Sequence, residues 1–154
     1  MYLIAICGGG GKTTLAKKYP NFFLDIDEFV WSNQNEKYHK NLILAFTNKN
    51  NDELGKQYKI IFKENKEKLK KLKKIILAHH PINAEWINIL CLGIYRPTKS
   101  LHQSNIQNRS DTLKQISINS WNSMNDENVI EYSTNQELEN ILCNHYYSKY
   151  PNVL

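Results

Sequence analysis

A run of four glycines, followed by a lysine and two threonines, stands directly after the apolar stretch Leu3–Ile6. The apolar stretch predicts a strand, and the residues after the glycines predict the start of a helix. Strand, glycine loop, Gly-Lys-Thr and helix form an arrangement that binds phosphate, because backbone amides reach phosphate oxygens where no Cβ atoms intervene. The positive end of the helix points at the same place. We therefore predict a phosphate-binding loop that consists of Gly8, Gly9, Gly10, Gly11, Lys12, Thr13 and Thr14.

Two side chains of this loop have separate expected roles. Lys12 is expected to reach the β- and γ-phosphates of ATP, and the Thr13 hydroxyl is expected to bind Mg²⁺. Counted back from Gly11, the pattern Gly-x-x-x-x-Gly-Lys-[Ser/Thr] has Ile6 where its first glycine is usual. This departure affects the expected geometry of the loop more than the expected ligand, because Gly8–Gly11, Lys12 and Thr13 are all present. Loss of Lys12 is expected to abolish turnover and to leave the fold intact.

A pair of acidic residues follows the next strand-like segment, in the sequence FFLDIDEF. Strands of an open α/β sheet present ligand-binding residues at their carboxyl ends, so Asp25 and Asp27 should lie on the same rim as the glycine loop. Asp25 is expected to hold Mg²⁺, directly or through water, and Asp27 to accept a proton from an attacking hydroxyl or to orient the attacking oxygen. The simpler interpretation is that one aspartate caps a helix that begins at Glu28.

The chain contains only two arginines, although lysine is abundant. The planar guanidinium group suits phosphoryl transfer, so each arginine is a candidate for a functional role. Arg109 lies in a polar stretch after a helix that begins near Thr98, where a mobile lid at about 100–112 could bring its charge over the transferring group. Arg96 closes the fourth predicted strand and is a candidate for substrate binding. A surface salt bridge is the alternative for both.

Two histidines, His79 and His80, end the third predicted strand. Neighbouring residues on a strand point to opposite faces, so the pair is not expected to bind one metal ion. Contact with the substrate, or a hydrogen bond to the end of the second strand, is the favoured interpretation. This strand lacks the terminal aspartate that often contacts Mg²⁺ in nucleotide sites, so Asp25 would have to supply that contact.

Apolar runs that alternate with helical periodicities predict an α/β fold, with a parallel sheet covered by helices on both faces. A mostly helical insertion is expected at about 33–73, interrupted near Asn48–Asp52. Within it, apolar residues recur at spacings of three and four from Leu54 to Leu72, which predicts one amphipathic helix with exposed lysines. The whole chain, 1–154, is expected to form one domain. The predicted strands are Tyr2–Ile6, Phe22–Asp25, Lys74–His79, Leu90–Tyr95 and Asn128–Tyr132.

The composition of the chain narrows the classes of function. The formal net charge is +5, but much of it comes from the lysines of Lys63–Lys74, so a solvated helix face is favoured over a nucleic-acid surface. The three cysteines are far apart and show no paired spacing, which argues against a disulfide framework and a zinc site. We find no apolar run of about 18 residues and no signal peptide, so we expect no membrane partner and a cytoplasmic location.

Together these features resemble the P-loop kinases of the nucleoside monophosphate kinase type. The resemblance rests on GGGGKTT, FFLDIDEF, the helical insertion and the arginine-bearing segment after the fourth strand. The second half, which contains IILAHHP, LGIYRP and NRSDTLKQISINSW, is more narrowly similar to small nucleotide kinases of phages and other viruses, which would act in a host cytoplasm.

The family implies a P-loop NTPase three-layer sandwich with strand order 2-3-1-4-5. It also implies ATP with Mg²⁺ as the phosphoryl donor, and a small-molecule acceptor, in this case a nucleotide. The expected catalytic residues are Lys12, Asp27 and Arg109. The candidates for contact with the acceptor are Asp27, His79, His80 and Arg96.

Three alternative functions share these motifs. A 5′-hydroxyl polynucleotide kinase would hold a phosphodiester backbone with the lysine-rich helix, or with Lys37 and Lys40, and its binding would weaken steeply with salt. A small-metabolite kinase of the shikimate or gluconate type would show neither this salt dependence nor a preference for a base. A non-catalytic nucleotide-binding module would bind ATP without transferring phosphate. Fold alone does not distinguish these functions.

Overall fold

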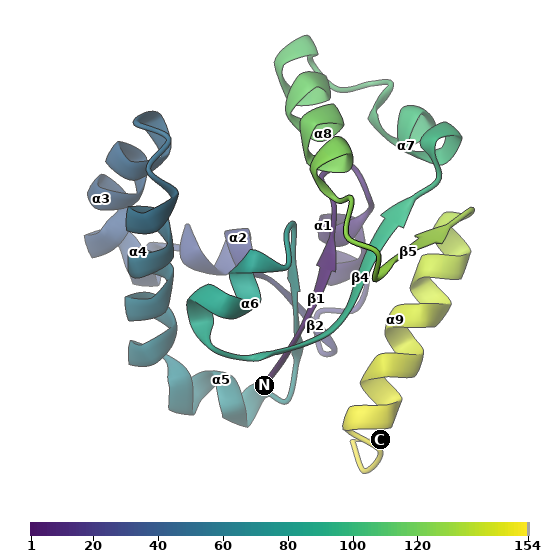
Figure 1. The fold of residues 1–154 in the computed structure, drawn as a ribbon. Helices are drawn as coiled ribbons and strands as arrows, with labels where there is room; N and C mark the ends of the chain where they lie inside the picture. The colour runs from purple at the N-terminus through teal and green to yellow at the C-terminus, as the bar shows by residue number, and fades with distance from the viewer. Residues whose placement is uncertain (154) are drawn as a thin grey trace.

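The computed structural model describes residues 1–153, and its centre is a sheet of five parallel strands in the order β2-β3-β1-β4-β5 (Figure 1). The parallel sheet and the strand order implied by the resemblance are therefore confirmed. β3 ends at Ala78, so both histidines follow this strand instead of ending it. The strands are β1 (Tyr2–Ile6), β2 (Phe23–Asp25), β3 (Ile75–Ala78), β4 (Leu90–Pro97) and β5 (Val129–Tyr132).

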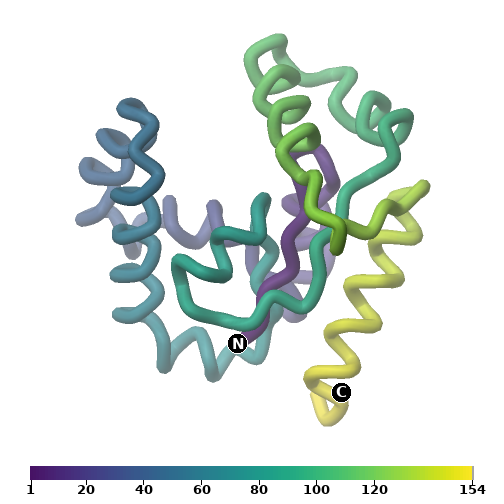
Figure 2. The backbone as a smooth tube through the Cα atoms, viewed as in Figure 1, coloured from purple at the N-terminus to yellow at the C-terminus, as the bar shows by residue number. Residues whose placement is uncertain are grey.

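Helices connect these strands and extend beyond the carboxyl edge of the sheet. They are α1 (Lys12–Lys18), α2 (Ile26–Val30), the 3-10 helix η1 (Asn33–Asn35), α3 (Glu36–Thr47), α4 (Asn51–Glu64), α5 (Lys66–Leu72), α6 (Ile82–Ile87), α7 (Lys99–Ile106), α8 (Asp111–Ser123) and α9 (Asn135–Lys149). The pair α3 and α4 stands on one side of the molecule, and α7 and α8 stand on the other (Figures 1 and 2). Within residues 1–153, none of the helices combines the length and the apolar character that a membrane span requires.

Alternate residues of the strands bury two apolar clusters, one on each face of the sheet. On one face, Ile4 and Ile6 of β1 belong to the cluster that includes residues of α1 and α9. On the other face, Leu3 and Ala5 belong to the cluster that includes residues of α2 to α6. Because β1 is central and buried on both faces, its packing fixes the position of Ile6, after which the glycine loop begins.

The single helix predicted from Leu54 to Leu72 is wrong, because the structure divides this segment into α4 and α5 at Asn65. The Asn65 side chain donates a hydrogen bond to the carbonyl oxygen of Ile61 at 2.8 Å, a local contact that favours a helix end. Leu69 of α5 is buried, but Leu72 is 41% exposed. The lysines of both helices are exposed, as predicted.

Candidate functional site

A cleft of about 1290 Å³ lies at the carboxyl edge of the sheet, next to the ends of β1, β2 and β3. The glycine loop, Gly8–Gly11, lines its centre, residues of α3 and α4 line one side, and residues of α8 line the other. Figure 2 shows these two helical walls rising on opposite sides of β1. Sites for one small ligand typically measure roughly 300–1,000 Å³, so this cleft has room for two ligands.

The glycine loop has a shape that requires glycine for two reasons. Gly9 and Gly11 have φ angles of 80° and 102°, a region that other residues rarely adopt. In addition, a Cβ atom on Gly9 would lie 2.5 Å from the side chain of Ile106. A Cβ atom on Gly10 would lie 2.5 Å from Ile6, the residue in place of the usual first glycine. These glycines therefore allow the loop to pack against the protein as well as to approach a ligand.

Three side chains from distant parts of the chain hold the carbonyl groups of this loop. The contacts are His102 Nε2 to Gly8 at 2.8 Å, Asn105 Nδ2 to Gly9 at 3.2 Å and the Tyr132 hydroxyl to Gly10 at 2.6 Å. In each contact the side chain donates and the carbonyl oxygen accepts. Nothing in the sequence predicts these contacts, because the three residues are 94, 96 and 122 positions away from their partners and show no local pattern.

Several amides of the loop and of the start of α1 have no partner in the part of the chain that the structure describes. The Gly8 amide donates to Ser120 Oγ at 2.8 Å. The amides without an acceptor belong to Gly9, Gly11, Lys12, Thr13 and Thr14. All five of these residues line the cleft. Unpaired amides beside a cleft are suited to bind the oxygens of an anionic group such as phosphate.

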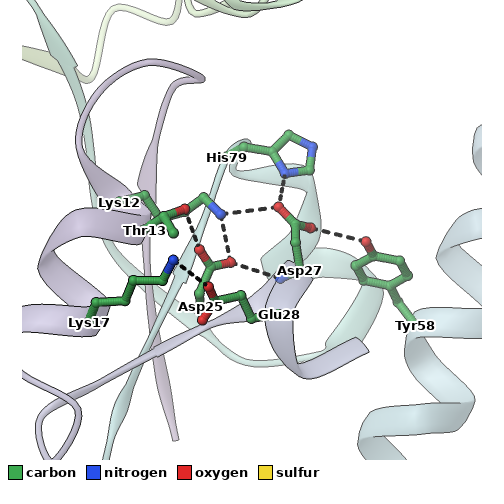
Figure 3. A network of polar contacts seen from close by, with 8 residues as sticks. All are labelled: Lys12, Thr13, Lys17, Asp25, Asp27, Glu28, Tyr58 and His79. Atoms are coloured by element: carbon green, nitrogen blue, oxygen red, sulfur yellow. Dashed lines mark hydrogen bonds and ion pairs between the residues drawn. The ribbon is translucent and has the colours of Figure 1, made fainter. Parts of the chain in front are cut away.

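Lys12 lies between two carboxylates at the end of β2 (Figure 3). Its Nζ is 2.7 Å from Asp25 Oδ1 and 3.1 Å from Asp27 Oδ2. The Thr13 hydroxyl donates a hydrogen bond to Asp25 Oδ2 at 2.8 Å. The structure thus brings together the lysine and threonine of the glycine motif and both aspartates, as the sequence predicted.

Asp25 is the buried member of this network, with a side chain that is 1% exposed. It accepts a hydrogen bond from the Asp27 amide at 3.0 Å and forms the N-cap of α2. The capping role considered from the sequence is therefore present, although the helix begins at Ile26 and not at Glu28. Lys12 and Thr13 contact both oxygens of Asp25, and Asp25 is not among the residues that line the cleft. Direct contact with a ligand in the cleft would require Lys12 to move.

Asp27 lines the cleft and has two further partners. The Tyr58 hydroxyl donates to Asp27 Oδ1 at 3.2 Å, and His79 Nδ1 lies 3.5 Å from Asp27 Oδ2. Burial acts to raise the pKa of the Asp27 carboxyl, but the contacts with His79 and Lys12 outweigh burial and lower it. Asp27 is therefore ionised at neutral pH. Burial, together with the charge of Asp27, raises the pKa of Tyr58, so its hydroxyl stays protonated and donates.

The lowered pKa of Asp27 predicts a pH-dependent contribution to stability. The ionised carboxylate stabilises the fold fully above its ordinary pKa of about 4, and this contribution is lost as the pH falls below that value. We expect Asp27→Asn to lower the free energy of unfolding at pH 7, and the difference from the parent protein to shrink as the pH approaches 3. Urea unfolding at pH 7, 5 and 3 measures it. A difference that stays constant over this range would contradict the expectation.

Two other predicted site residues also line the cleft. Thr14 lies at the start of α1, beside the glycine loop. Arg109 is exposed in the turn between α7 and α8, and its guanidinium donates to Ser117 Oγ at 3.0 Å. Arg109 therefore borders the cleft from the wall opposite α3 and α4.

The structure does not bring His80 or Arg96 to the cleft. His80 Nδ1 accepts a hydrogen bond from the Ile82 amide at 3.2 Å. Arg96 Nε is 2.9 Å from Glu131 Oε2, and the guanidinium lies over the Trp121 ring. For Arg96, the salt bridge that the sequence analysis considered is present.

The sequence does not predict the aromatic residues of the cleft, and Tyr58 fits the apolar spacing of the segment Leu54–Leu72. The four aromatic side chains that line the cleft are Trp31, Phe46, Tyr58 and Trp86. Trp31 and Phe46 each stand directly before a polar run, SNQN and TNKN.

Neither protein family models, nor curated proteins, nor solved structures gave a match to this chain. Residues 1–153 contain no group of three or more histidine, cysteine, aspartate or glutamate side chains placed to hold a metal ion. The three cysteines are free, as expected, and burial raises the pKa of the Cys7 thiol to about 12.

Proposed function

We propose that the protein is an ATP- and Mg²⁺-dependent phosphotransferase, a P-loop kinase that transfers the γ-phosphoryl group of ATP to a small-molecule acceptor. The observation that carries this proposal is the position of Lys12 between Asp25 and Asp27, beside a loop with unpaired amides. Phosphoryl transfer depends on positioning and on stabilisation of charge. A cation, free amides and an ionised carboxylate at one edge of a cleft supply both.

The donor would be held by the glycine loop and Lys12. The free amides would bind phosphate oxygens, and Lys12 would exchange Asp25 and Asp27 for the β- and γ-phosphates. Arg109 borders the same cleft and is available to stabilise the charge of the transferring group.

Thr13 and Asp25 suit a Mg²⁺ ion. Mg²⁺ prefers oxygen ligands and keeps several waters, so one or two protein ligands are enough when phosphates supply the others. The Thr13 hydroxyl and an Asp25 oxygen are 2.8 Å apart, which allows both to take part in one coordination shell, directly or through water. When bound, the ion would neutralise phosphate charge.

Asp27 would act on the acceptor. When Lys12 turns to the donor, Asp27 loses one of the contacts that lower its pKa, and it becomes a stronger base. Tyr58 and His79 would keep the carboxylate oriented while this happens. The nucleotide acceptor, and the polynucleotide and metabolite alternatives, remain predictions.

Calorimetric titration with ATP and Mg²⁺, followed by a transfer assay with γ-labelled ATP, tests the proposal. We expect saturable ATP binding, and transfer of label to an acceptor that stops when EDTA removes Mg²⁺. If well-folded protein gives no heat with ATP and Mg²⁺, the proposed function is wrong. Binding without transfer to any acceptor would favour a non-catalytic nucleotide-binding module. Ile6 in place of the first glycine and the missing aspartate after β3 make that module the second candidate.

A further inference from the structure

Four aromatic rings line the cleft, and the hydroxyl of one of them, Tyr58, contacts Asp27. Trp31 follows α2, Phe46 belongs to α3, and Tyr58 and Trp86 belong to α4 and α6. Trp31 and Phe46 are 38% and 67% exposed, so they leave large apolar surfaces uncovered. Aromatic surfaces of this kind bind planar rings by stacking.

Two of these rings form a wall that ends at the carboxylate of Asp27. Gly55 of α4 makes room for the Trp86 indole, because a Cβ atom at this position would lie 2.8 Å from it. The Trp86 and Tyr58 rings meet edge to face with their centroids 5.3 Å apart. The Tyr58 hydroxyl then donates to Asp27 at 3.2 Å. The aromatic wall and the proposed base are thus held in one arrangement.

The charges around Asp27 disfavour a phosphate group on the acceptor. The two basic side chains nearest to it, Lys12 and His79, already contact the Asp27 carboxylate. In the proposed reaction Lys12 turns to the donor, so it is not available to a second phosphate. An acceptor phosphate would therefore lie beside the donor phosphates and the negative charge of Asp27 without a cation of its own.

The other cationic side chains considered do not lie beside Asp27, where an acceptor phosphate would need a partner. Arg96 lies outside the cleft and pairs with Glu131. Arg109 and Lys49 line the cleft from the turns at the outer ends of its two walls, the α7–α8 turn and the α3–α4 turn. Among the described residues, neither of them contacts Asp27.

From these observations we infer that the acceptor is an uncharged alcohol joined to a planar aromatic or heteroaromatic ring, which is the chemistry of a nucleoside. The ring would stack in the aromatic part of the cleft, and the hydroxyl would lie against Asp27. This inference rests on the proposed function and names the acceptor class for the same site. It differs from the nucleotide acceptor that the resemblance implies.

The reaction balances with ATP as the only co-substrate. The acceptor oxygen forms a bond to the γ-phosphorus, and the bond between that phosphorus and the β–γ bridging oxygen breaks. The bridging oxygen keeps the electron pair and leaves as part of ADP. The hydroxyl proton passes to the Asp27 carboxylate and then to solvent.

A panel assay with γ-labelled ATP and Mg²⁺ tests the acceptor class. It pairs each nucleoside with its 5′-monophosphate and adds a 5′-hydroxyl oligonucleotide, shikimate and gluconate. We expect kcat/KM for the best nucleoside to exceed that for its monophosphate by about 100-fold, because the position beside Asp27 offers no free cation for the added charge. The oligonucleotide carries the same alcohol and ring together with ionised phosphodiesters, so preferred transfer to it would contradict an uncharged acceptor.

Three results would overturn the inference. They are preferred transfer to a monophosphate, preferred transfer to the oligonucleotide, and preferred transfer to shikimate or gluconate. All three leave donor binding intact. All three also require transfer of the label, so they are distinguishable from failure of the proposed function, in which ATP does not bind or is bound without transfer to any acceptor.

Variants of the exposed rings provide a second test. Phe46→Ala and Trp31→Ala should each raise KM for the nucleoside by about 5- to 50-fold, from the usual strength of base stacking, and leave the Kd for ATP unchanged. Ile43→Ala is the matched control, because Ile43 is 55% exposed on the same helix as Phe46 and does not line the cleft. If both ring variants keep the parent KM, the rings do not bind the acceptor and the inference is wrong.

Discussion

Replacing Lys12 with methionine is expected to abolish phosphoryl transfer and to destabilise the protein at the same time. Transfer should fall by at least about 10²–10³-fold, the usual effect of removing a group that stabilises transition-state charge. Stability should fall by about 3 kcal/mol, because the change leaves Asp25, whose side chain is 1% exposed, without its cation. The sequence alone suggested that the fold would be unaffected by this loss. The transfer assay and urea unfolding at pH 7 measure the two effects.

Two further variants separate the effects of Lys12→Met on catalysis and on stability. Lys17→Met is the control, because Lys17 pairs with Glu28 at 3.6 Å on the surface, where such a pair contributes at most about 1 kcal/mol. The double variant Lys12→Met with Asp25→Asn removes both charges and should regain part of the lost stability while it stays inactive. A Lys12→Met protein with parental turnover would exclude the proposed role of Lys12.

Replacing Gly9 with alanine is expected to damage the proposed donor site. The backbone at Gly9 has a φ of 80°, and the new Cβ atom would lie 2.5 Å from Ile106 and 3.0 Å from His102. Left-handed backbone strain and overpacking together should lower stability by about 2–4 kcal/mol. Displacement of His102 would also release the Gly8 carbonyl, so ATP affinity should fall. Urea unfolding and calorimetry measure the two effects.

Gly11→Ala is the matched control for this change. Gly11 also has a positive φ, 102°, but its Cβ atom would come no closer than 3.7 Å to another side chain. Only the backbone strain should remain, at about 1–2 kcal/mol. Equal losses at the two positions would show that contact with Ile106 and His102 does not matter.

Much of the fold could be predicted because it depends on local patterns. Short apolar runs separated by helical segments identify the parallel strands, and every strand was found within a few residues of its place. The meeting of Lys12 with Asp25 and Asp27 was also predictable, since parallel strands deliver their following residues to one edge. The pairing of Lys12 with both aspartates at once was not, because it depends on side-chain geometry.

What could not be predicted depends on contacts between distant segments. Nothing near His102 or Tyr132 in the sequence indicates that they hold carbonyls of the glycine loop. Tyr58 has the spacing of a buried helix residue, and its hydroxyl reaches Asp27 only because α4 packs beside the sheet edge. The break at Asn65 was missed because an asparagine in a lysine-rich helix gives only a weak signal, whereas its side-chain contact ends the helix.

The hydrogen bonds that fasten α7 and α8 to the glycine loop limit how Arg109 can travel. Asn105 is attached to Gly9 on one side of Arg109, and Ser120 is attached to Gly8 on the other. If Arg109 moved toward bound phosphates, only the segment between these two hydrogen-bonded residues would have to move, and α7 as a whole would stay in place. The moving part of the protein would be a short segment, not a domain, and the range of its motion would be set by the length of chain between Asn105 and Ser120.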